Sequence, residues 1–355
     1  MQKNNKRLLL TGGCGFIGHH FVEHILKNTE WDIVILDRLN YASNGFDRLR
    51  DIEAFDDKRV SVLTADFTKP IADGLKQEIG DVNYIVHMGA ETHVDNSIKN
   101  PEPFVMSNVL GTMRMLDFAR EIKPEKFIQF STDEVYGPAP GEVLYKESDR
   151  HNPTNPYAAT KSGAEMLAMA YANCYNVPVM ITNTMNVFGE RQHPEKFIPG
   201  TIKKILKGEK VIIHGNKDKT KAGTRFYIHA RNVASALFWL IKTEKFIKEA
   251  KYFIGEDGLP YYRYRYNIVG ELEVDNLQLA KLINEDIKEI TGATKTDFNY
   301  EIVDFHSARP GHDLRYGLDG SKLKGMGYEI PKAFEESLKK TVEWFLDKKN
   351  KRWLE

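Results

Sequence analysis

The stretch Leu8-Leu-Leu-Thr-Gly-Gly-Cys-Gly-Phe-Ile-Gly18 decides the fold class of this chain. An apolar run that can form a buried strand leads directly into a turn with glycine at 12, 15 and 18. Such a strand–turn–helix joint can hold a dinucleotide pyrophosphate, because glycine permits unusual dihedrals and lets phosphates approach the backbone amides. The spacing is not the standard G-x-G-x-x-G, and such glycines can serve packing alone. We predict cofactor contacts at Gly12, Gly15, Phe16, Ile17 and Gly18.

A carboxylate at the end of the second predicted strand supports a dinucleotide site. Asp37 follows the glycines by about 20 residues, where it can accept hydrogen bonds from both hydroxyls of an adenosine ribose. It would repel a 2′-phosphate, so we expect NAD rather than NADP. Arg38 could pair with a phosphate and weakens this preference, but we interpret it as a solvated surface arginine. Asp66, after the third predicted strand, is either a ligand of the adenine amino group or a helix cap.

The first half of the chain alternates short apolar runs with longer stretches of helical periodicity, which is typical of parallel strands joined by crossover helices. We predict strands at residues 8–11, 33–36, 60–63, 84–87, 126–131 and 177–182, with helices at 21–27, 104–121 and 162–174. After Asn183 this alternation fails, although 266–269 resembles a returning strand, and 275–291 and 334–349 have helical spacing. The expected fold is α/β, a Rossmann-like doubly wound parallel sheet with a smaller interleaved α/β substrate-binding domain. The predicted boundaries are 1–185 and 226–252 for the cofactor domain, and 186–225 and 253–355 for the substrate domain.

The composition favours a small, roughly neutral partner. The 355 residues include 50 Lys and Arg against 50 Asp and Glu, without a long block of one sign, so we expect no nucleic-acid or membrane partner. Two cysteines in so long a chain are not a disulfide framework, which favours a reducing compartment. The apolar stretch near the start is too short for a signal peptide or membrane span, so we predict a cytoplasmic protein. We expect no metal.

Two short motifs carry the candidate chemistry. Tyr157-Ala-Ala-Thr-Lys161 places a phenol and an ammonium on one face of a predicted helix. The ammonium, helped by an oxidised nicotinamide, would favour phenolate and let Tyr157 remove a proton from an alcohol. Alone, such a pair is usually an ordinary surface pair, but the structure-breaking residues 152–156 before it make it more specific. Upstream, Ser131-Thr-Asp-Glu134 ends a strand with hydroxyls and two carboxylates, and the carboxyl ends of strands face the ligand crevice in this fold.

Taken with His193-Pro-Glu-Lys-Phe-Ile-Pro199 and Arg309-Pro-Gly-His-Asp313, these motifs resemble the extended short-chain dehydrogenase/reductase family. Within it they are most similar to nucleoside-diphosphate-glucose 4,6-dehydratases of the dTDP-glucose type, nearly end to end. The Thr-Asp-Glu triplet is the most specific element, because related sugar 4-epimerases commonly lack such a carboxylate pair. This chain departs from the family at Asn96, usually an arginine, and at 226–231, usually an acidic-aromatic stretch.

The resemblance implies a nucleoside-diphosphate sugar substrate and an order of events. Tyr157 and Lys161 would support oxidation of the sugar C4 hydroxyl, with Thr132 hydrogen-bonding the C4 oxygen. The resulting ketone acidifies the C5 hydrogen, so Glu134 would take that proton while Asp133 donates to the departing C6 hydroxyl, and the hydride then returns to C6. The two carboxyls need opposite protonation states, which mutual repulsion and unequal burial would supply.

The resemblance also implies substrate contacts, an assembly and two competing functions. The matching substrate positions are Asn186, Glu195, Lys196, Arg225, Asn267 and His312. Helices 104–121 and 162–174 resemble those that pair in this family, so we expect a homodimer. We expect dTDP-glucose as the substrate, with UDP or another nucleotide as the alternative carrier of the sugar. A sugar-nucleotide 4-epimerase and a non-catalytic NAD-binding protein are the alternatives; the Asp133-Glu134 pair argues against the first, and the complete acid, base and phenol set against the second.

Overall fold

The computed structural model describes residues 5–255, 257–294, 296, 298–305 and 313–355. Its main unit is a parallel sheet in the order β12-β6-β5-β4-β1-β2-β3. These strands are β1 (Arg7–Thr11), β2 (Asp32–Asp37), β3 (Val60–Thr64), β4 (Tyr84–His87), β5 (Lys126–Thr132), β6 (Val179–Thr184) and β12 (Arg265–Ile268). The strand order reverses direction between β1 and β4, as in a doubly wound sheet. The predicted fold class is confirmed.

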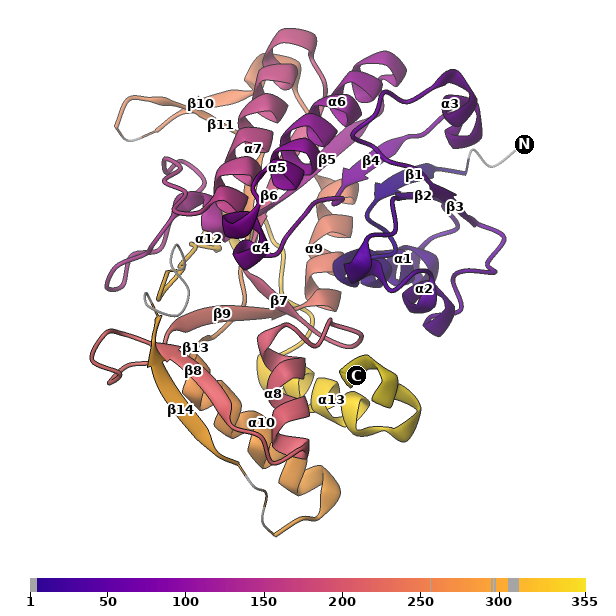
Figure 1. Ribbon diagram of the computed structural model, residues 1–355. Coiled ribbons are helices and arrows are strands. Elements are labelled where there is room, and N and C mark those ends of the chain that lie inside the picture. The colour runs from indigo at the N-terminus through magenta and orange to yellow at the C-terminus, as the bar shows by residue number, and fades with distance from the viewer. Residues whose placement is uncertain (1–4, 256, 295, 297, 306–312) are drawn as a thin grey trace.

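Helices cover both faces of this sheet. Those of the main unit are α1 (Phe16–Asn28), α2 (Asp47–Asp51), α3 (Asp73–Ile79), α4 (Val94–Lys99), α5 (Glu102–Phe104), α6 (Gly111–Ile122), α7 (Pro156–Tyr175) and α9 (Ala230–Thr243). The helices α6 and α7 run side by side on one face, and α1 and α9 pack together on the other (Figure 1). Right-handed crossovers place successive helices in this way, because the chain moves outward from β1 in opposite directions in the two halves.

The smaller unit lies at the carboxyl ends of the main strands (Figure 1). It contains the sheet β13-β9-β7, the pair β14-β8, and a separate apolar core that includes Ile202, Ile213 and Ile283. Its elements are β7 (Asn186–Phe188), β8 (Val211–Gly215), β9 (Thr224–His229), β13 (Glu273–Asp275), β14 (Tyr300–Asp304), α8 (Phe197–Leu206), α10 (Asn276–Thr291), α13 (Phe334–Leu346) and the 3-10 helix η5 (Lys348–Leu354). The remaining elements are a hairpin of β10 (Tyr252–Ile254) and β11 (Pro260–Tyr262), helix α12 (Ser321–Gly325), and the 3-10 turns η1 (Tyr41–Ser43), η3 (Asp133–Tyr136) and η4 (Lys248–Ala250).

The chain passes between the two units at other residues than the predicted domain boundaries. Residues 265–268, assigned to the substrate domain, form β12 on the outer edge of β6 in the main sheet. Tyr266 and Ile268 are buried there, so β12 covers an edge that would otherwise expose unpaired main-chain groups. The predicted boundary at 226 cuts β9, which pairs with β7 and β13 in the smaller unit.

The predicted helix 104–121 is interrupted. Residues Val105–Leu110 form the π-helical segment η2 between α5 and α6. This wider turn carries Asn108, whose amide donates to the backbone carbonyl of Glu91 at 3.0 Å and to the Thr160 hydroxyl at 3.0 Å. The deviation from regular helix therefore joins the loop after β4 to α7, at the carboxyl end of the sheet. Within the described part of the chain, no helix combines the length and apolar character needed to cross a membrane.

Candidate active site

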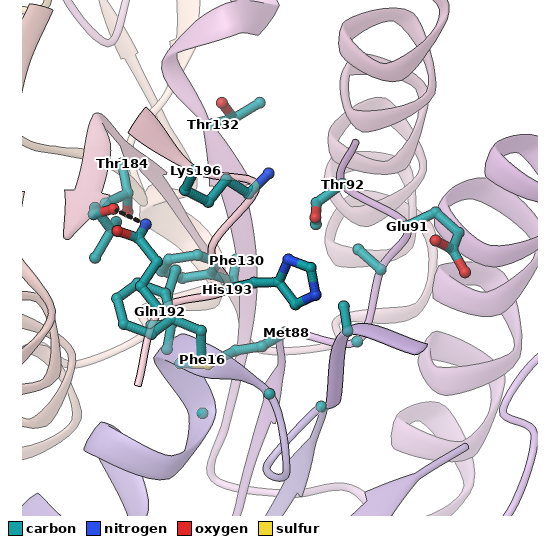
Figure 2. A pocket seen from close by; sticks show the side chains of 18 of the residues that line it. Phe16, Met88, Glu91, Thr92, Phe130, Thr132, Thr184, Gln192, His193 and Lys196 are labelled. Carbon is teal, nitrogen blue, oxygen red and sulfur yellow. Dashed lines mark hydrogen bonds between the residues drawn. The ribbon is translucent and has the colours of Figure 1, made fainter. Parts of the chain in front are cut away.

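A cavity of about 350 Å³ lies between the carboxyl ends of the main strands and the smaller unit. The loops after β1, β2, β4 and β5 form one side, and residues 184–198 form the other. Figure 2 shows Lys196 and His193 reaching in from one wall, opposite Glu91 and Thr92. The predicted site residues that line it are Gly12, Gly15, Phe16, Ile17, Gly18, Asp37, Thr132, Glu134, Tyr157, Lys161, Asn186, Glu195 and Lys196. Gly12 and Lys196, which are 184 positions apart in the sequence, thus meet at one site.

The glycine turn has the close backbone packing that a dinucleotide site requires. Gly12 has a φ of +73°, in the region where glycine is favoured. A Cβ at Gly18 would lie 2.2 Å from the Gly12 carbonyl oxygen, so an alanine cannot fit without movement. Helix α1 begins directly after Gly15, with no acidic side chain in its first turn and no side-chain cap. Its N-terminus is therefore suited to an anion such as a pyrophosphate.

The carboxylate of Asp37 lies at the end of β2 on the cavity wall. Its two oxygens accept hydrogen bonds from the backbone amides of Cys14 at 3.0 Å and Leu39 at 2.9 Å. Burial raises the pKa of Asp37, and these amides oppose the shift. Arg38 is not the solvated side chain that we expected: it forms an ion pair with Glu91 across the cavity. The Glu91 carboxylate neutralises Arg38, the cation that could have paired with a 2′-phosphate.

Asp66 does not line the cavity. It is exposed, and its carboxylate accepts a hydrogen bond from the backbone amide of Thr68 at 3.0 Å. This bond and the Thr68 hydroxyl help to hold the pKa of Asp66 below its ordinary value. In this structure Asp66 therefore holds a local turn and is not the helix cap that we gave as the alternative to an adenine contact, since the next helix, α3, begins at Asp73.

Tyr157 and Lys161 lie one turn apart on α7, both buried. The Lys161 ammonium donates to the Phe130 carbonyl oxygen at 2.6 Å, and burial lowers the pKa of Lys161 to about 8. Burial and the neighbouring carboxylates of Glu134 and Asp133 raise the pKa of Tyr157, and a hydrogen bond with the Thr132 hydroxyl opposes this. Lys161 alone therefore does not produce a phenolate, and a second positive charge at the site is needed.

The adjacent carboxyls of Asp133 and Glu134 have different surroundings. Asp133 is only 4% exposed, and burial followed by the charge of Glu134 raises the pKa of Asp133 to about 7. One of its oxygens accepts from the Thr132 hydroxyl at 3.0 Å, and the other has no partner among the described residues. The half-buried Glu134 accepts from the Asn155 amide at 3.1 Å and the Tyr316 hydroxyl at 3.4 Å.

Burial also raises the pKa of Glu134, but its neighbours favour the charged form. The Asn155 amide acts most strongly, followed by the positive charges of Arg225 and Lys196. Asp133 therefore holds a proton more firmly than an ordinary aspartate, while amide and cationic partners surround Glu134. Mutual repulsion and unequal burial were the expected causes of this difference, and hydrogen bonding contributes as well. A weak acid and a carboxylate base are thus placed side by side.

The predicted substrate residues differ in their positions. Asn186, Glu195 and Lys196 line the cavity, and Lys196 lies 3.6 Å from a Glu195 oxygen. Arg225 is buried outside the lining, with its guanidinium donating to the carbonyls of Asp313 at 2.6 Å and Leu314 at 2.7 Å. Asn267 is fully buried on β12.

The Asn267 amide donates to the carbonyls of Tyr145 at 2.9 Å and Asp319 at 3.1 Å, so its contacts are those of a structural residue. His312 lies outside the described residues. The structure thus brings three of the six predicted substrate positions to the cavity wall.

Sequence reasoning missed several residues at the site. Arg48, Asn40, Glu91, Gln192 and His193 also line the cavity. His193 begins one of the motifs quoted above but was given no role there; the others lie in loops or a short helix, where neither periodicity nor a predicted role separated them from ordinary surface residues. No group of three or more His, Cys, Asp and Glu side chains suited to a metal ion occurs within the described ranges.

Fold and site together define a Rossmann-type protein of the short-chain dehydrogenase/reductase class, with a glycine turn for a dinucleotide and a Tyr-x-x-x-Lys pair. Residues 9–341 match the family model described as GDP-mannose 4,6 dehydratase. The chain belongs to this family.

Similar proteins agree with that assignment. The low-salt glycan biosynthesis protein Agl12 of Haloferax volcanii is 35% identical, with 96% of this chain and 98% of that protein covered. A dTDP-glucose 4,6-dehydratase of Escherichia coli is 33% identical, with 98% and 94% covered. The crystal structure of a double mutant of DesIV, a dTDP-glucose 4,6-dehydratase of Streptomyces venezuelae that holds NAD, is 31% identical and superimposes with a TM-score of 0.81, covering 98% and 100% of the two chains.

Proposed function

We propose that this protein is an NAD-dependent nucleoside-diphosphate-sugar 4,6-dehydratase, with dTDP-glucose as its substrate. The observation that carries the proposal is the placement of Glu134 with Tyr157 on the cavity wall, with the adjacent Asp133 buried just outside the cavity lining. Oxidation alone requires the phenol and a hydride acceptor, whereas elimination of water also requires a base and an acid. The names of the dTDP-glucose dehydratases to which the chain is similar support the choice of sugar nucleotide.

The protein's residues account for the first step. NAD, when bound, supplies a hydride acceptor for the sugar C4 and later returns the hydride to C6. Tyr157 removes the C4 hydroxyl proton, and the positive charge of the oxidised nicotinamide, with Lys161, supplies the charge that the phenolate needs. Thr132 hydrogen-bonds both Tyr157 and Asp133, so its hydroxyl connects the oxidation site to the elimination site. A Thr132 hydroxyl in this position would hold the C4 oxygen of the sugar close to Tyr157.

Elimination uses the two carboxyls in turn. The ketone at C4 acidifies the C5 hydrogen, and Glu134, held by Asn155 and Tyr316, takes that proton. Asp133 carries the proton needed by the departing C6 hydroxyl, because its pKa, raised to about 7, keeps about half of these carboxyls protonated at pH 7 and more at lower pH. The C5–H and C6–O bonds break, a C5–C6 double bond forms and one water leaves. Hydride return to C6 and protonation at C5 then give the 4-keto-6-deoxy sugar.

The test is an incubation of the purified protein with dTDP-glucose and UDP-glucose in D₂O. We expect a dTDP-4-keto-6-deoxyglucose product with solvent deuterium at C5, formed faster than its UDP counterpart. Faster turnover of UDP-glucose would reassign the nucleotide. A C4-epimerised product without deuterium at C5 would replace the dehydratase with a 4-epimerase, and bound NAD without any product would favour a non-catalytic protein.

The variant Glu134→Gln separates the steps, because it keeps the size of the side chain and removes the base. We expect it to oxidise C4 and accumulate reduced cofactor with a 4-keto-glucose nucleotide, while product formation falls about 10²- to 10⁴-fold. Glu142→Gln, a change in an exposed loop outside the cavity, is the matched control and should keep the wild-type rate. Wild-type turnover by Glu134→Gln would remove the assignment of the base.

A further inference from the structure

Arg48 is a fully buried guanidinium on the five-residue helix α2. Its Nη1 donates to the carbonyl oxygens of Ala42 at 2.8 Å and Ser43 at 2.7 Å, and its Nε donates to the carbonyl oxygen of Arg191 at 3.0 Å. Nη2 has no hydrogen-bond partner among the described residues, although Arg48 is one of the side chains that line the cavity. A buried cation with a free donor is costly in free energy unless that donor finds a hydrogen-bond acceptor.

The carbonyls that Arg48 holds belong to two segments of the chain, of which residues 42–43 line the cavity and Arg191 lies next to the lining residue Gln192. Ala42 and Ser43 form η1, which follows Asp37 and lines the side predicted to hold the adenosine ribose. Arg191 lies beyond β7, in the segment that leads into the smaller unit, and has a left-handed φ of +64°. One guanidinium therefore holds the η1 turn of the main unit against the segment that leads into the smaller unit.

The C-terminal 3-10 helix η5 covers Arg48 from the side away from the cavity. The Trp353 ring lies 5.1 Å from the Arg48 guanidinium carbon, within the range of a cation–π contact. The Trp353 indole donates to Asp51 at 2.9 Å, and Arg191 lies 3.3 Å from the same carboxylate oxygen. Arg352 also pairs with Asp51.

Asp51 is the last residue of α2, three residues after Arg48, so η5 docks on the helix that carries the guanidinium. None of the η5 residues 348–354 is among those that line the cavity. They reach the site through Arg48 and Asp51, and also through α8, whose Phe197 and Ile198 line the cavity. This arrangement allows η5 to influence the cavity without touching a ligand.

Charge also links Arg48 to the cofactor side. Burial lowers the pKa of Arg48 to about 10, and the Asp37 carboxylate opposes that shift more than any other group. Arg48 in turn lowers the raised pKa of Asp37, after the Leu39 and Cys14 amides and Arg38. Each side chain thus helps to keep the other charged, and a charged Asp37 is the form that accepts bonds from ribose hydroxyls.

We propose that Arg48 is a positioning residue for the adenosine end of the bound dinucleotide, and that docking of η5 on Arg48 and Asp51 slows loss of the dinucleotide. The inference rests on the NAD site of the proposed function but not on the reaction. A dehydratase that returns its hydride to the same sugar reuses one cofactor molecule, so slow release serves that chemistry. Because coupling is reciprocal, NAD binding should also hold η5 in place.

The first test measures NAD binding by titration calorimetry on full-length protein stripped of nucleotide, without sugar substrate. We expect Arg48→Lys, which keeps the charge but not the forked donors, to raise the Kd for NAD about tenfold. Trp353→Phe, which keeps a ring and removes the bond to Asp51, should raise it about threefold. Arg50→Lys is the matched control, because Arg50 is exposed on the same helix and lies 3.6 Å from Asp47; its Kd should match wild type.

The second test follows amide hydrogen exchange in residues 348–354. We expect NAD to slow this exchange in wild type and in Arg50→Lys, and to slow it less in Arg48→Lys. A wild-type Kd in Arg48→Lys would overturn the positioning role. If Arg48→Lys does not fold, Trp353→Phe still tests the role of η5, and a wild-type Kd for NAD in that variant would overturn it. Amide exchange in residues 348–354 that NAD leaves unchanged in wild type would overturn it as well. Protein that binds NAD in this way yet makes no 4-keto-6-deoxy sugar would refute the proposed function alone.

Discussion

The acid role of Asp133 predicts an alkaline limit to activity. Burial and the charge of Glu134 raise the pKa of Asp133 from an ordinary 3.8 to about 7. At about 1.4 kcal/mol for each tenfold change in the ionisation constant, this amounts to about 4 kcal/mol in favour of the protonated carboxyl. Because the pKa in the folded protein is the higher one, Asp133 keeps its proton below pH 7 and loses it as the pH rises through 7.

The size of the effect follows from the protonated fraction. That fraction is about one half at pH 7, about one tenth at pH 8 and about one hundredth at pH 9. If protonated Asp133 is required, kcat/KM should fall about fivefold from pH 7 to pH 8 and about fiftyfold from pH 7 to pH 9. The kcat/KM profile is the appropriate one, because it reports the groups of the enzyme before the sugar binds.

The assay is formation of the 4-keto-6-deoxy product by the NAD-loaded enzyme between pH 5.5 and 9.5, alongside two variants. Asp133→Asn keeps the size of the side chain but has no carboxyl proton, so it should lose about 10²- to 10⁴-fold in rate and lack a pKa near 7. Asp286→Asn is the control, since Asp286 on α10 also has a raised pKa, about 6, but the charges around it are those of Lys339, Glu289, Glu285 and Glu335 in place of the predicted catalytic residues. Its profile should match wild type. A wild-type alkaline limb in Asp133→Asn would refute the reasoning.

Three further predictions concern the phenol, the glycine turn and the assembly. Tyr157→Phe removes the proton acceptor, so added substrate should leave the bound cofactor oxidised; appearance of NADH absorbance would contradict this role. Gly18→Ala places a Cβ 2.2 Å from the Gly12 carbonyl oxygen, so it should abolish NAD retention and cost at least ~1–3 kcal/mol of unfolding free energy, whereas Gly74→Ala, with open space around it, should do neither. Light scattering should give a homodimer mass at micromolar concentration, and a monomer mass would exclude pairing through the α6 and α7 faces.

Local sequence patterns located most of the main sheet. The strand predicted at 84–87 coincides with β4, and that at 8–11 misses only the first residue of β1. Both are continuous apolar runs that are buried on two sides, so composition alone marks them. The helix predicted at 104–121 was less accurate, because the π-helical turn at Val105–Leu110 depends on contacts of Asn108 with Glu91 and Thr160.

The candidate site residues likewise divide into those that local motifs located well and those that they did not. The glycines, Asp37, Thr132, Glu134, Tyr157 and Lys161 belong to motifs in which residue type and spacing are tied to the chemistry, and all of them line the cavity. Arg225 and Asn267 matched family positions equally well, yet their side chains bond to distant backbone carbonyls. A match of sequence positions gives no information on whether a polar group is already engaged within the protein.

The sequence by itself thus predicted the doubly wound sheet, the dinucleotide turn and, through the family resemblance, the acid, base and phenol set, because residue type and local spacing mark the parts of each. Only the tertiary structure showed what raises the pKa of Asp133, which cations are already engaged and how the C-terminus reaches the cofactor side. Glu134 meets Tyr316, and Arg48 meets Trp353, through contacts between residues far apart in the chain. The pKa values and free donors that set function at this site arise from the burial and hydrogen bonding that such contacts create.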